Sequence, residues 1–242
     1  MKRKLNCLFV INLLIFAQVF PKKAIDLPSP YCDLKEVLPF NGHGWYTNGV
    51  WIEKLMKQNK IYTVIEVGSW LGASTRHIAS LLQANGKLYA VDTWEGSVEH
   101  YENQEWKKML PTLYEQFLSN IVHAQLTDRI IPVKSTSINA ALDLKNQINK
   151  VDLIFIDAGH DTESVLNDLV IYWPFVQNNE GVLCGDDWYW ESVRKAVIIF
   201  AKNYKLTLYA DDNFWFLKKE DDFNLKSFKT SSNDVWIFDR LQ

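Results

Sequence analysis

The fold of this chain is decided by residues 61–74, which read IYTVIEVGSWLGAS. The β-branched, apolar run at 61–67 is typical of a buried strand, and it ends at Gly68. Apolar residues then recur at helical spacing, which predicts a helix over 73–82. The glycine-containing turn between the two segments therefore joins a strand to a helix.

The same alternation continues toward the C-terminus. Further strands are predicted at 87–91, 129–133, 151–156, 181–184, 206–209 and 214–217, with helices at 113–126, 138–148, 163–176 and 192–201. Near-continuous apolar strands separated by helices are typical of a parallel sheet covered on both faces. Only residues 210–213 separate the last two strands, which predicts an antiparallel hairpin. We expect a doubly wound α/β fold with a seven-stranded, mostly parallel sheet.

Composition narrows the function classes. The chain has 242 residues, of which 48% are hydrophobic and 23% charged, so it is neither collagen-like nor disordered by composition. A net charge of -3 lacks the basic excess that favours nucleic acid or anionic lipid, so we expect no nucleic-acid partner. The three cysteines lie too far apart for a metal or redox motif. Small-molecule chemistry is favoured, and the oligomeric state is left open.

Residues 1–23 form an apolar N-terminal segment with a cationic start, which is the outline of a signal peptide. Its apolar run, 5–20, is shorter than the roughly 20 residues of a spanning helix. The segment could be a secretion signal, a short membrane anchor or an uncleaved extension. The protein would be exported in the first case, membrane-anchored in the second and cytoplasmic in the third. Membrane contact is expected only through this segment.

Three further parts follow along the chain. Residues 24–60 are expected to be a linker and an N-terminal helix, because prolines at 28, 30 and 39 favour extended backbone. Residues 61–218 form the main domain. Residues 219–242 form a polar tail with a short strand predicted at 235–238.

In an open α/β sheet, ligands bind at the carboxyl ends of the strands, where the strand order reverses. The residues at those ends are Glu66, Gly68, Asp92, Ser135, Thr136, Asp157, His160, Asp186 and Asp187. The turn after the first strand could bring backbone N–H groups to an anionic ligand, or it could be an ordinary tight turn. Asp92 closes the second strand about twenty residues later, which suits the ribose hydroxyls of a nucleoside. Together the turn and Asp92 favour a nucleoside cofactor.

Three acids indicate a cation. Asp157, Asp186 and Asp187 would meet in one crevice, where their repulsion would raise their pKa values unless a cation neutralised them. Oxygen ligands suit Mg²⁺, Mn²⁺ or Ca²⁺ better than zinc. The alternative is that Asp157 and Asp187 cap the helices that follow them. His160 lies three residues after Asp157 and could take a proton from a substrate hydroxyl, or it could be a simple hydrogen-bonding residue.

These motifs, in this order, resemble the class I S-adenosylmethionine-dependent methyltransferases, which share a Rossmann-like fold. The pattern runs Glu66-x-Gly68-x-x-x-Gly72-x-Ser74, then Asp92, then Asp157-x-x-His160, then Gly185-Asp186-Asp187. It is similar to the metal-dependent O-methyltransferases, and most of all to the macrocin-type group, methyltransferase family 24.

The resemblance implies roles for the residues at these positions. Glu66, Gly68, Ser69, Gly72 and Ser74 would hold the methionine part of S-adenosylmethionine, Asp92 the ribose, and Ser135 or Thr136 the adenine side. Asp157, Asp186 and Asp187 would bind a divalent metal, expected to be Mg²⁺, and His160 would be the catalytic base beside Asp157.

Two departures from the catechol enzymes stand out. His160 replaces their lysine base, and Asp187 replaces an asparagine, which adds a negative charge to the site. The implied reaction is in-line methyl transfer to a hydroxyl of a small-molecule acceptor. The aromatic segment 94–106 could cover that acceptor as a lid, or it could be an ordinary loop.

Two other functions stay open at this point. One is a non-catalytic nucleoside- or metal-binding protein that is exported. The other is a nicotinamide-linked oxidoreductase, which the missing third glycine and the carboxylates disfavour.

Overall fold

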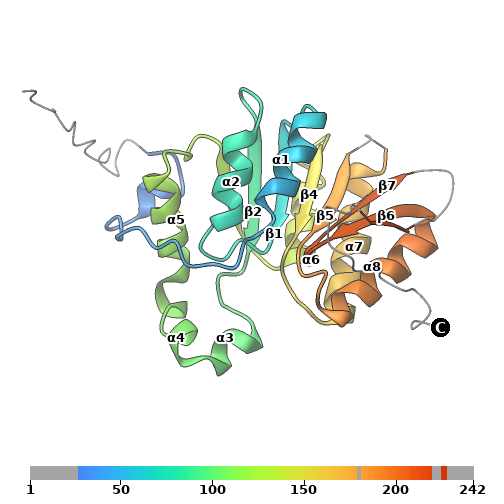
Figure 1. Ribbon diagram of the computed structural model, residues 1–242. Helices are drawn as coiled ribbons and strands as arrows, with labels where there is room; N and C mark the ends of the chain where they lie inside the picture. Colours follow the sequence, from blue (N-terminus) through green and yellow to red (C-terminus); the bar gives the residue numbers. More distant parts are fainter. Residues whose placement is uncertain (1–26, 179–180, 220–224, 228–242) are drawn as a thin grey trace, which may run out of the picture.

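The protein is described by a computed structural model that covers residues 27–178, 181–219 and 225–227. Its centre is a mixed sheet with the strand order β3-β2-β1-β4-β5-β7-β6-β8 (Figure 1). The strands are β1 (Thr63–Val67), β2 (Lys87–Asp92), β3 (Ile130–Lys134), β4 (Leu153–Ile156), β5 (Val182–Gly185), β6 (Leu206–Asp211), β7 (Phe214–Lys219) and β8 (Leu225–Ser227).

The pairing of the strands confirms the predicted fold class. Strands β1 to β5 pair in parallel, and β7 is antiparallel to both β5 and β6. All seven predicted strands are present, and the last two form the expected antiparallel hairpin. The short strand β8 adds to the sheet beside β6, in parallel. The strand predicted at 235–238 lies outside the described residues.

Helices cover both faces of the sheet. They are α1 (Gly49–Gln58), α2 (Ala73–Leu81), α3 (Val98–Glu102), α4 (Gln104–Lys107), α5 (Leu113–His123), α6 (Ser137–Leu144), α7 (Thr162–Val176) and α8 (Glu191–Tyr204), with short 3-10 turns η2 (Tyr31–Asp33) and η3 (Leu110–Thr112). Buried residues of α6, α7 and α8 pack in one hydrophobic cluster, whereas those of η2, α1, α2 and α5 pack in another. The predicted helices are therefore present, with ends that differ by a few residues.

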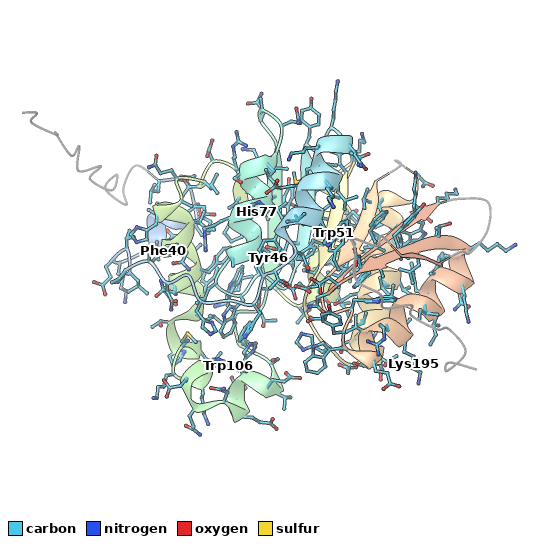
Figure 2. The ribbon with its side chains drawn as sticks, in the orientation of Figure 1. Phe40, Tyr46, Trp51, His77, Trp106 and Lys195 are labelled. Carbon is cyan, nitrogen blue, oxygen red and sulfur yellow. The ribbon has the colours of Figure 1, made fainter. Side chains whose placement is uncertain are left out.

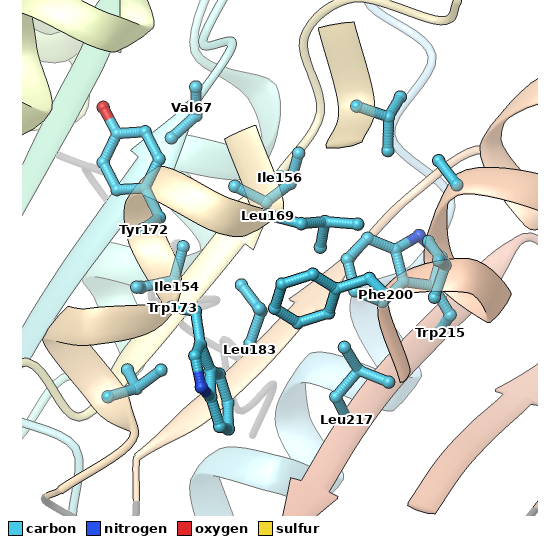
Figure 3. Packing of buried hydrophobic residues seen from close by; sticks show 14 of the residues in the cluster. Val67, Ile154, Ile156, Leu169, Tyr172, Trp173, Leu183, Phe200, Trp215 and Leu217 are labelled. Atoms are coloured by element: carbon cyan, nitrogen blue, oxygen red, sulfur yellow. The ribbon is translucent and has the colours of Figure 1, made fainter. Parts of the chain in front are cut away.

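The larger cluster is built from wide aromatic and branched side chains. Figure 3 shows Trp215 of β7, Leu183 of β5 and Phe200 of α8 packed against one another, and each is at most 1% exposed. Trp215 also donates its indole N–H to the backbone oxygen of Asp186, 2.8 Å away. The core therefore holds the end of β5 in place.

The chain before α1 packs on the domain instead of standing away from it. Tyr31 is 1% exposed, and its hydroxyl donates to the backbone oxygen of Ile130 at the start of β3. Residues 38–46, which we term the N-terminal strap, continue along α5 toward the carboxyl ends of the strands. Within the described part of the chain, no helix is both long and apolar enough to span a membrane.

The strand order reverses between β1 and β4. The chain runs outward from β1 through β2 to β3, then returns to place β4 on the other side of β1. Such a reversal separates the loops that follow the two strands and leaves a crevice between them. The loop after Val67 and the loop after Ile156 therefore form opposite sides of one hollow.

Candidate functional site

A cavity of about 660 Å³ lies at the carboxyl ends of the parallel strands. Its wall contains residues from the ends of β1, β2, β4 and β5, together with the strap and helices α3 and α4. The volume falls within the range of about 300–1,000 Å³ that is typical of small-molecule sites. The cavity therefore lies at the edge of the sheet where the sequence predicts a ligand site.

The turn after β1 is held open by glycine. Gly68 has φ +91°, and a Cβ at this position would lie 1.8 Å from the backbone oxygen of Asp157. The close approach of these two backbones leaves no room for a side chain. Trp70, two residues later, also has positive φ (47°), a conformation that is rare for a bulky residue and usually found where function requires it.

Glu66 lies behind this turn, outside the cavity wall. It is 0% exposed, and its Oε2 accepts hydrogen bonds from the hydroxyls of Ser69, at 2.7 Å, and Thr75. Burial raises the pKa of Glu66 to about 7, and hydrogen bonds from Ser74, Thr75 and Ser69 oppose that rise. The observed role of Glu66 is to brace the turn.

Some of the other turn residues line the cavity, and one supports the turn from behind. Gly68, Ser69 and Ser74 line the cavity. Gly72 instead precedes α2 with φ +78° and packs against Phe117, so it shapes the start of the helix.

Asp92 ties the turn to the end of β2. Its Oδ2 accepts from the backbone N–H groups of Ser69 and Trp70, both at 2.9 Å, and its Oδ1 accepts from that of Trp94 at 2.8 Å. A carboxylate offers about four lone-pair positions, so three are already used. Asp92 lines the cavity, but part of its bonding capacity goes to the protein's own backbone.

The side of the cavity beyond β3 carries small polar groups. Ser135 and Thr136 line it, and Thr136 caps α6 by accepting from the backbone N–H of Asn139 at 3.3 Å. Asp168 of α7 also lines this side, although the sequence analysis overlooked it. It is 4% exposed, and burial raises its pKa to about 6. The sequence could have indicated that Asp168 is buried, because it lies between Val165 and Leu169 on the buried side of α7.

The acids after β4 and β5 meet as expected, together with the histidine. One ligand atom each from Asp157, His160 and Asp187 lies within 4.8 Å of the others. His160 Nε2 is 3.0 Å from Asp187 Oδ2, and this hydrogen bond raises the pKa of the imidazole. Burial, followed by repulsion from Asp186 and Asp187, raises the pKa of Asp157.

Asp186 lies beside this trio but is bonded elsewhere. Its Oδ1 accepts from the backbone N–H of Asp187 and from the side chain of Asn213, both at 2.6 Å. Burial raises the pKa of Asp186 above its usual range. Asp187 itself has φ +63°, so the chain turns sharply to aim this acid at His160.

The capping alternative for the acids does not hold. Asp161 caps α7 by accepting from the backbone N–H groups of Glu163 and Ser164, and α8 begins after Trp190. Asp157 and Asp187 therefore have no helix start to satisfy, and their carboxylates remain available to each other and to His160.

The trio fits a divalent cation. It offers two carboxylate oxygens and an imidazole nitrogen at separations that one ion can bridge. The pKa of Asp157 is raised first by burial and then by repulsion from Asp186 and Asp187, and a cation would offset both effects. Carboxylates favour Mg²⁺ and Mn²⁺, while the imidazole suits the softer transition metals as well.

Aromatic side chains form the remaining wall. Trp70 stacks on His100 with ring centroids 4.2 Å apart, and Trp45 meets Trp106 edge-to-face at 4.8 Å. All four line the cavity, and we term them the aromatic wall. In Figure 2, Trp106 lies on α4, below Tyr46 of the strap. The segment predicted as a lid thus contributes His100 and Trp106, whereas Trp45 was missed because no strand or helix period marks the strap.

Comparison with known families identifies the chain. Residues 65–188, just over half of it, match the sequence model of methyltransferase family 24, described as a methyltransferase domain. The chain belongs to this family. The match begins in β1 and ends just after Asp187, so it contains the turn, Asp92 and the trio. No curated protein sequence matches the methyltransferase.

Solved structures share the fold of this methyltransferase. An O-methyltransferase from Bacillus cereus, solved with SAH, superposes with a TM-score of 0.56 at 17% identity, over 78% of this chain and 86% of its own. A putative O-methyltransferase from Klebsiella pneumoniae gives 0.56 at 18% identity, over 74% and 83%. The O-methyltransferase TomG from Streptomyces achromogenes, solved with SAM, gives 0.51 at 16% identity, over 77% and 83%. By family and fold, the chain is a class I S-adenosylmethionine-dependent methyltransferase.

Proposed function

We propose that this methyltransferase moves the methyl group of S-adenosylmethionine to a hydroxyl of a small-molecule acceptor, with a divalent metal at the trio. One observation carries the proposal. The same cavity has the turn and Asp92 on one side and the trio of Asp157, His160 and Asp187 on the other. A nucleoside cofactor and a metal-assisted hydroxyl would then meet in one cavity.

The cofactor side divides into three contacts. Backbone groups of Gly68 and Ser69, with the Ser74 hydroxyl, hold the methionine part of the cofactor. Asp92 accepts from the ribose with the capacity that its backbone bonds leave free. Ser135 and Thr136 lie at the adenine end, where the Asp168 carboxylate can accept from an exocyclic amine.

A divalent cation would be held by Asp157 and Asp187, with Asp186 beside them. When bound, it supplies positive charge that lowers the pKa of the acceptor hydroxyl and orients its oxygen. The carboxylate oxygens favour Mg²⁺ as this cation.

His160 is the proton acceptor in this proposal. With its Nε2–H donating to Asp187, the neutral imidazole carries its lone pair on Nδ1. This Nδ1 has no hydrogen-bond partner in the described structure, but it is buried, so the ring must shift for the acceptor hydroxyl to reach it. Asp187 thus fixes the tautomer, and Trp190, stacked on the ring at 4.8 Å, fixes its plane.

Calorimetric titration of the full chain with S-adenosylhomocysteine tests the cofactor. We expect micromolar binding that Asp92→Ala abolishes, because that change removes both the ribose acceptor and the bonds that shape the turn. Asp143→Ala, an exposed acid on α6, is the matched control and should bind normally. No binding by the wild-type protein would contradict the proposal.

A titration with Mg²⁺ distinguishes the two proposed roles in the trio, which are metal ligand and proton acceptor. Asp157→Asn should lose Mg²⁺ binding, because it removes a carboxylate ligand. His160→Gln should keep Mg²⁺ binding and lose methyl transfer, because the proton acceptor is not needed to hold the ion. If His160→Gln also loses Mg²⁺, the histidine is a ligand and the assignment of the base is wrong.

A further inference from the structure

Part of the aromatic wall is exposed at the cavity. Trp45 is 50% exposed although its ring meets Trp106 at 4.8 Å and lies 5.9 Å from Trp70. One hydrogen bond joins Trp70 to the strap, because its indole N–H donates to Nδ1 of the His43 side chain at 3.3 Å. Partly exposed aromatic rings beside a cavity suit a flat ring or a cation, since the π face of such a ring carries negative charge.

Acidic side chains dominate the charge of the cavity wall. The acids in its wall are Asp92, Glu99, Asp157, Asp168, Asp186 and Asp187. None of the described residues that line it is Lys or Arg. A divalent cation and the sulfonium of the cofactor would offset only part of this charge. A phosphorylated or carboxylated acceptor would therefore meet repulsion where it entered.

Glu99 is the acid that the cofactor and metal leave unused. It lies on α3 directly before His100, and it is exposed at the cavity. Hydrogen bonding to Ser97 lowers its pKa, so the carboxylate is charged at neutral pH. Neither Lys nor Arg forms a salt bridge with it among the described residues. A carboxylate without a Lys or Arg partner, in the same cavity wall as aromatic rings, is the usual chemistry of a site for an organic cation.

We propose that Glu99 and the aromatic wall form a subsite for a protonated amine, so that the acceptor is an amine-bearing hydroxyl compound. This inference rests on the proposed function, because it concerns the acceptor side of the same cavity. The amine would lie over the faces of Trp45 and Trp106 with Glu99 as its counter-charge. The hydroxyl that receives the methyl group would then point toward His160.

Three probes of similar shape and different charge test the subsite: tyramine, 4-ethylphenol and 3-(4-hydroxyphenyl)propionate. Each is titrated into the full chain loaded with S-adenosylhomocysteine and Mg²⁺. We expect tyramine to bind about tenfold more tightly than 4-ethylphenol, which is the scale of one partly desolvated cation–π contact with a counter-charge. The propionate should bind most weakly.

Variants assign the effect to the residues named. Glu99→Gln should weaken tyramine several-fold and leave 4-ethylphenol unchanged, whereas Trp45→Ala should weaken both. Glu102→Gln, an exposed acid on the same short helix, is the matched control and should preserve the wild-type order. The affinity for S-adenosylhomocysteine should stay the same in all three variants.

The outcomes separate this inference from the proposed function. Equal affinities for the three probes, tightest binding of the propionate, or no binding of any probe by the loaded protein would each overturn the amine subsite. Failure of the wild-type protein to bind S-adenosylhomocysteine at all would instead overturn the proposed function.

Discussion

Glu66 is a carboxylic acid with no exposed surface, and its titration is coupled to folding. Its pKa is about 7 in the folded protein, against an ordinary value of 4.5 that the unfolded chain would show. The folded state therefore binds more protons than the unfolded state between these pH values. The stability that Glu66 contributes is complete below pH 4.5 and is lost as the pH rises through 7.

The variant Glu66→Gln tests this dependence in the cofactor-free protein. Because Gln stays neutral, the variant should gain on the order of 3 kcal/mol relative to wild type between pH 4.5 and pH 8. Urea unfolding at both pH values measures the difference. The exposed Glu36→Gln should give no such gain, and wild-type and Glu66→Gln curves that stay parallel would refute the prediction.

Gly68 is a second position at which a single added atom, a Cβ, should change stability and binding. Gly68→Ala would place its Cβ 1.8 Å from the backbone oxygen of Asp157, so one of the two strand ends must move. We expect a loss of at least about 3 kcal/mol in the free energy of unfolding, with S-adenosylhomocysteine binding abolished. Gly42→Ala, whose Cβ would meet only the side chain of Phe40, should change neither. A stable Gly68→Ala protein that binds normally would contradict the geometry.

Helix α5 connects the strap to the turn through one buried amide. Asn120 is 0% exposed; its Oδ1 accepts from the backbone N–H of Asn41 at 3.0 Å, and its Nδ2 donates to the oxygens of Asn41 and Leu71, both at 2.8 Å. Gln116 also donates to Oδ1, at 3.2 Å. All four hydrogen-bonding positions of this side chain are thus used.

Asn120→Ala should therefore cost about 3 kcal/mol, because it removes three hydrogen bonds to backbone groups and leaves the N–H and the oxygen of Asn41 without this partner. The aromatic wall should loosen with the strap, so tyramine binding should weaken more than S-adenosylhomocysteine binding. Gln116→Ala removes two hydrogen bonds, one to the backbone oxygen of Pro39 and one to Asn120 Oδ1, at a half-buried position, and should cost less than Asn120→Ala, on the order of 1 kcal/mol. Urea unfolding and the two titrations provide the comparison, and equal costs for the two variants would count against the role of Asn120.

The sequence predicted the helices and strands, and the site residues at strand ends, wherever a hydrophobic period or the end of a strand marked them. Strands appeared as β-branched runs that stop at polar residues, and these stops located Asp92, Asp157 and Asp187. The strap has neither period nor strand, so Trp45 and Asn41 could not be placed in advance. Glu66 follows the alternation of its strand, but nothing in the sequence tells whether an acid at a strand end faces the cavity or the core.

The whole molecule should respond to its cofactor as one folding unit, since both hydrophobic clusters pack on the same sheet. A ligand that binds only the folded state at 100 times its Kd adds about 2.7 kcal/mol. S-adenosylhomocysteine at that level should raise the Tm by roughly 5–10 °C. NADH serves as the control and should leave the Tm unchanged. A larger shift with NADH than with S-adenosylhomocysteine would reverse the choice of cofactor.

The strap also bears on how relatives of this enzyme diverge. The residues that match the family, 65–188, include the cofactor side of the cavity but begin after Trp45 and Tyr46. One wall of the cavity, on the side proposed for the acceptor, is thus encoded upstream of the residues that match the family, and hydrogen bonds to Ser119, Asn120 and Trp70 attach it to the rest of the protein. Exchange of residues 38–46 between related enzymes is therefore a route by which acceptor preference can evolve, or be engineered, while the methyl donor stays the same.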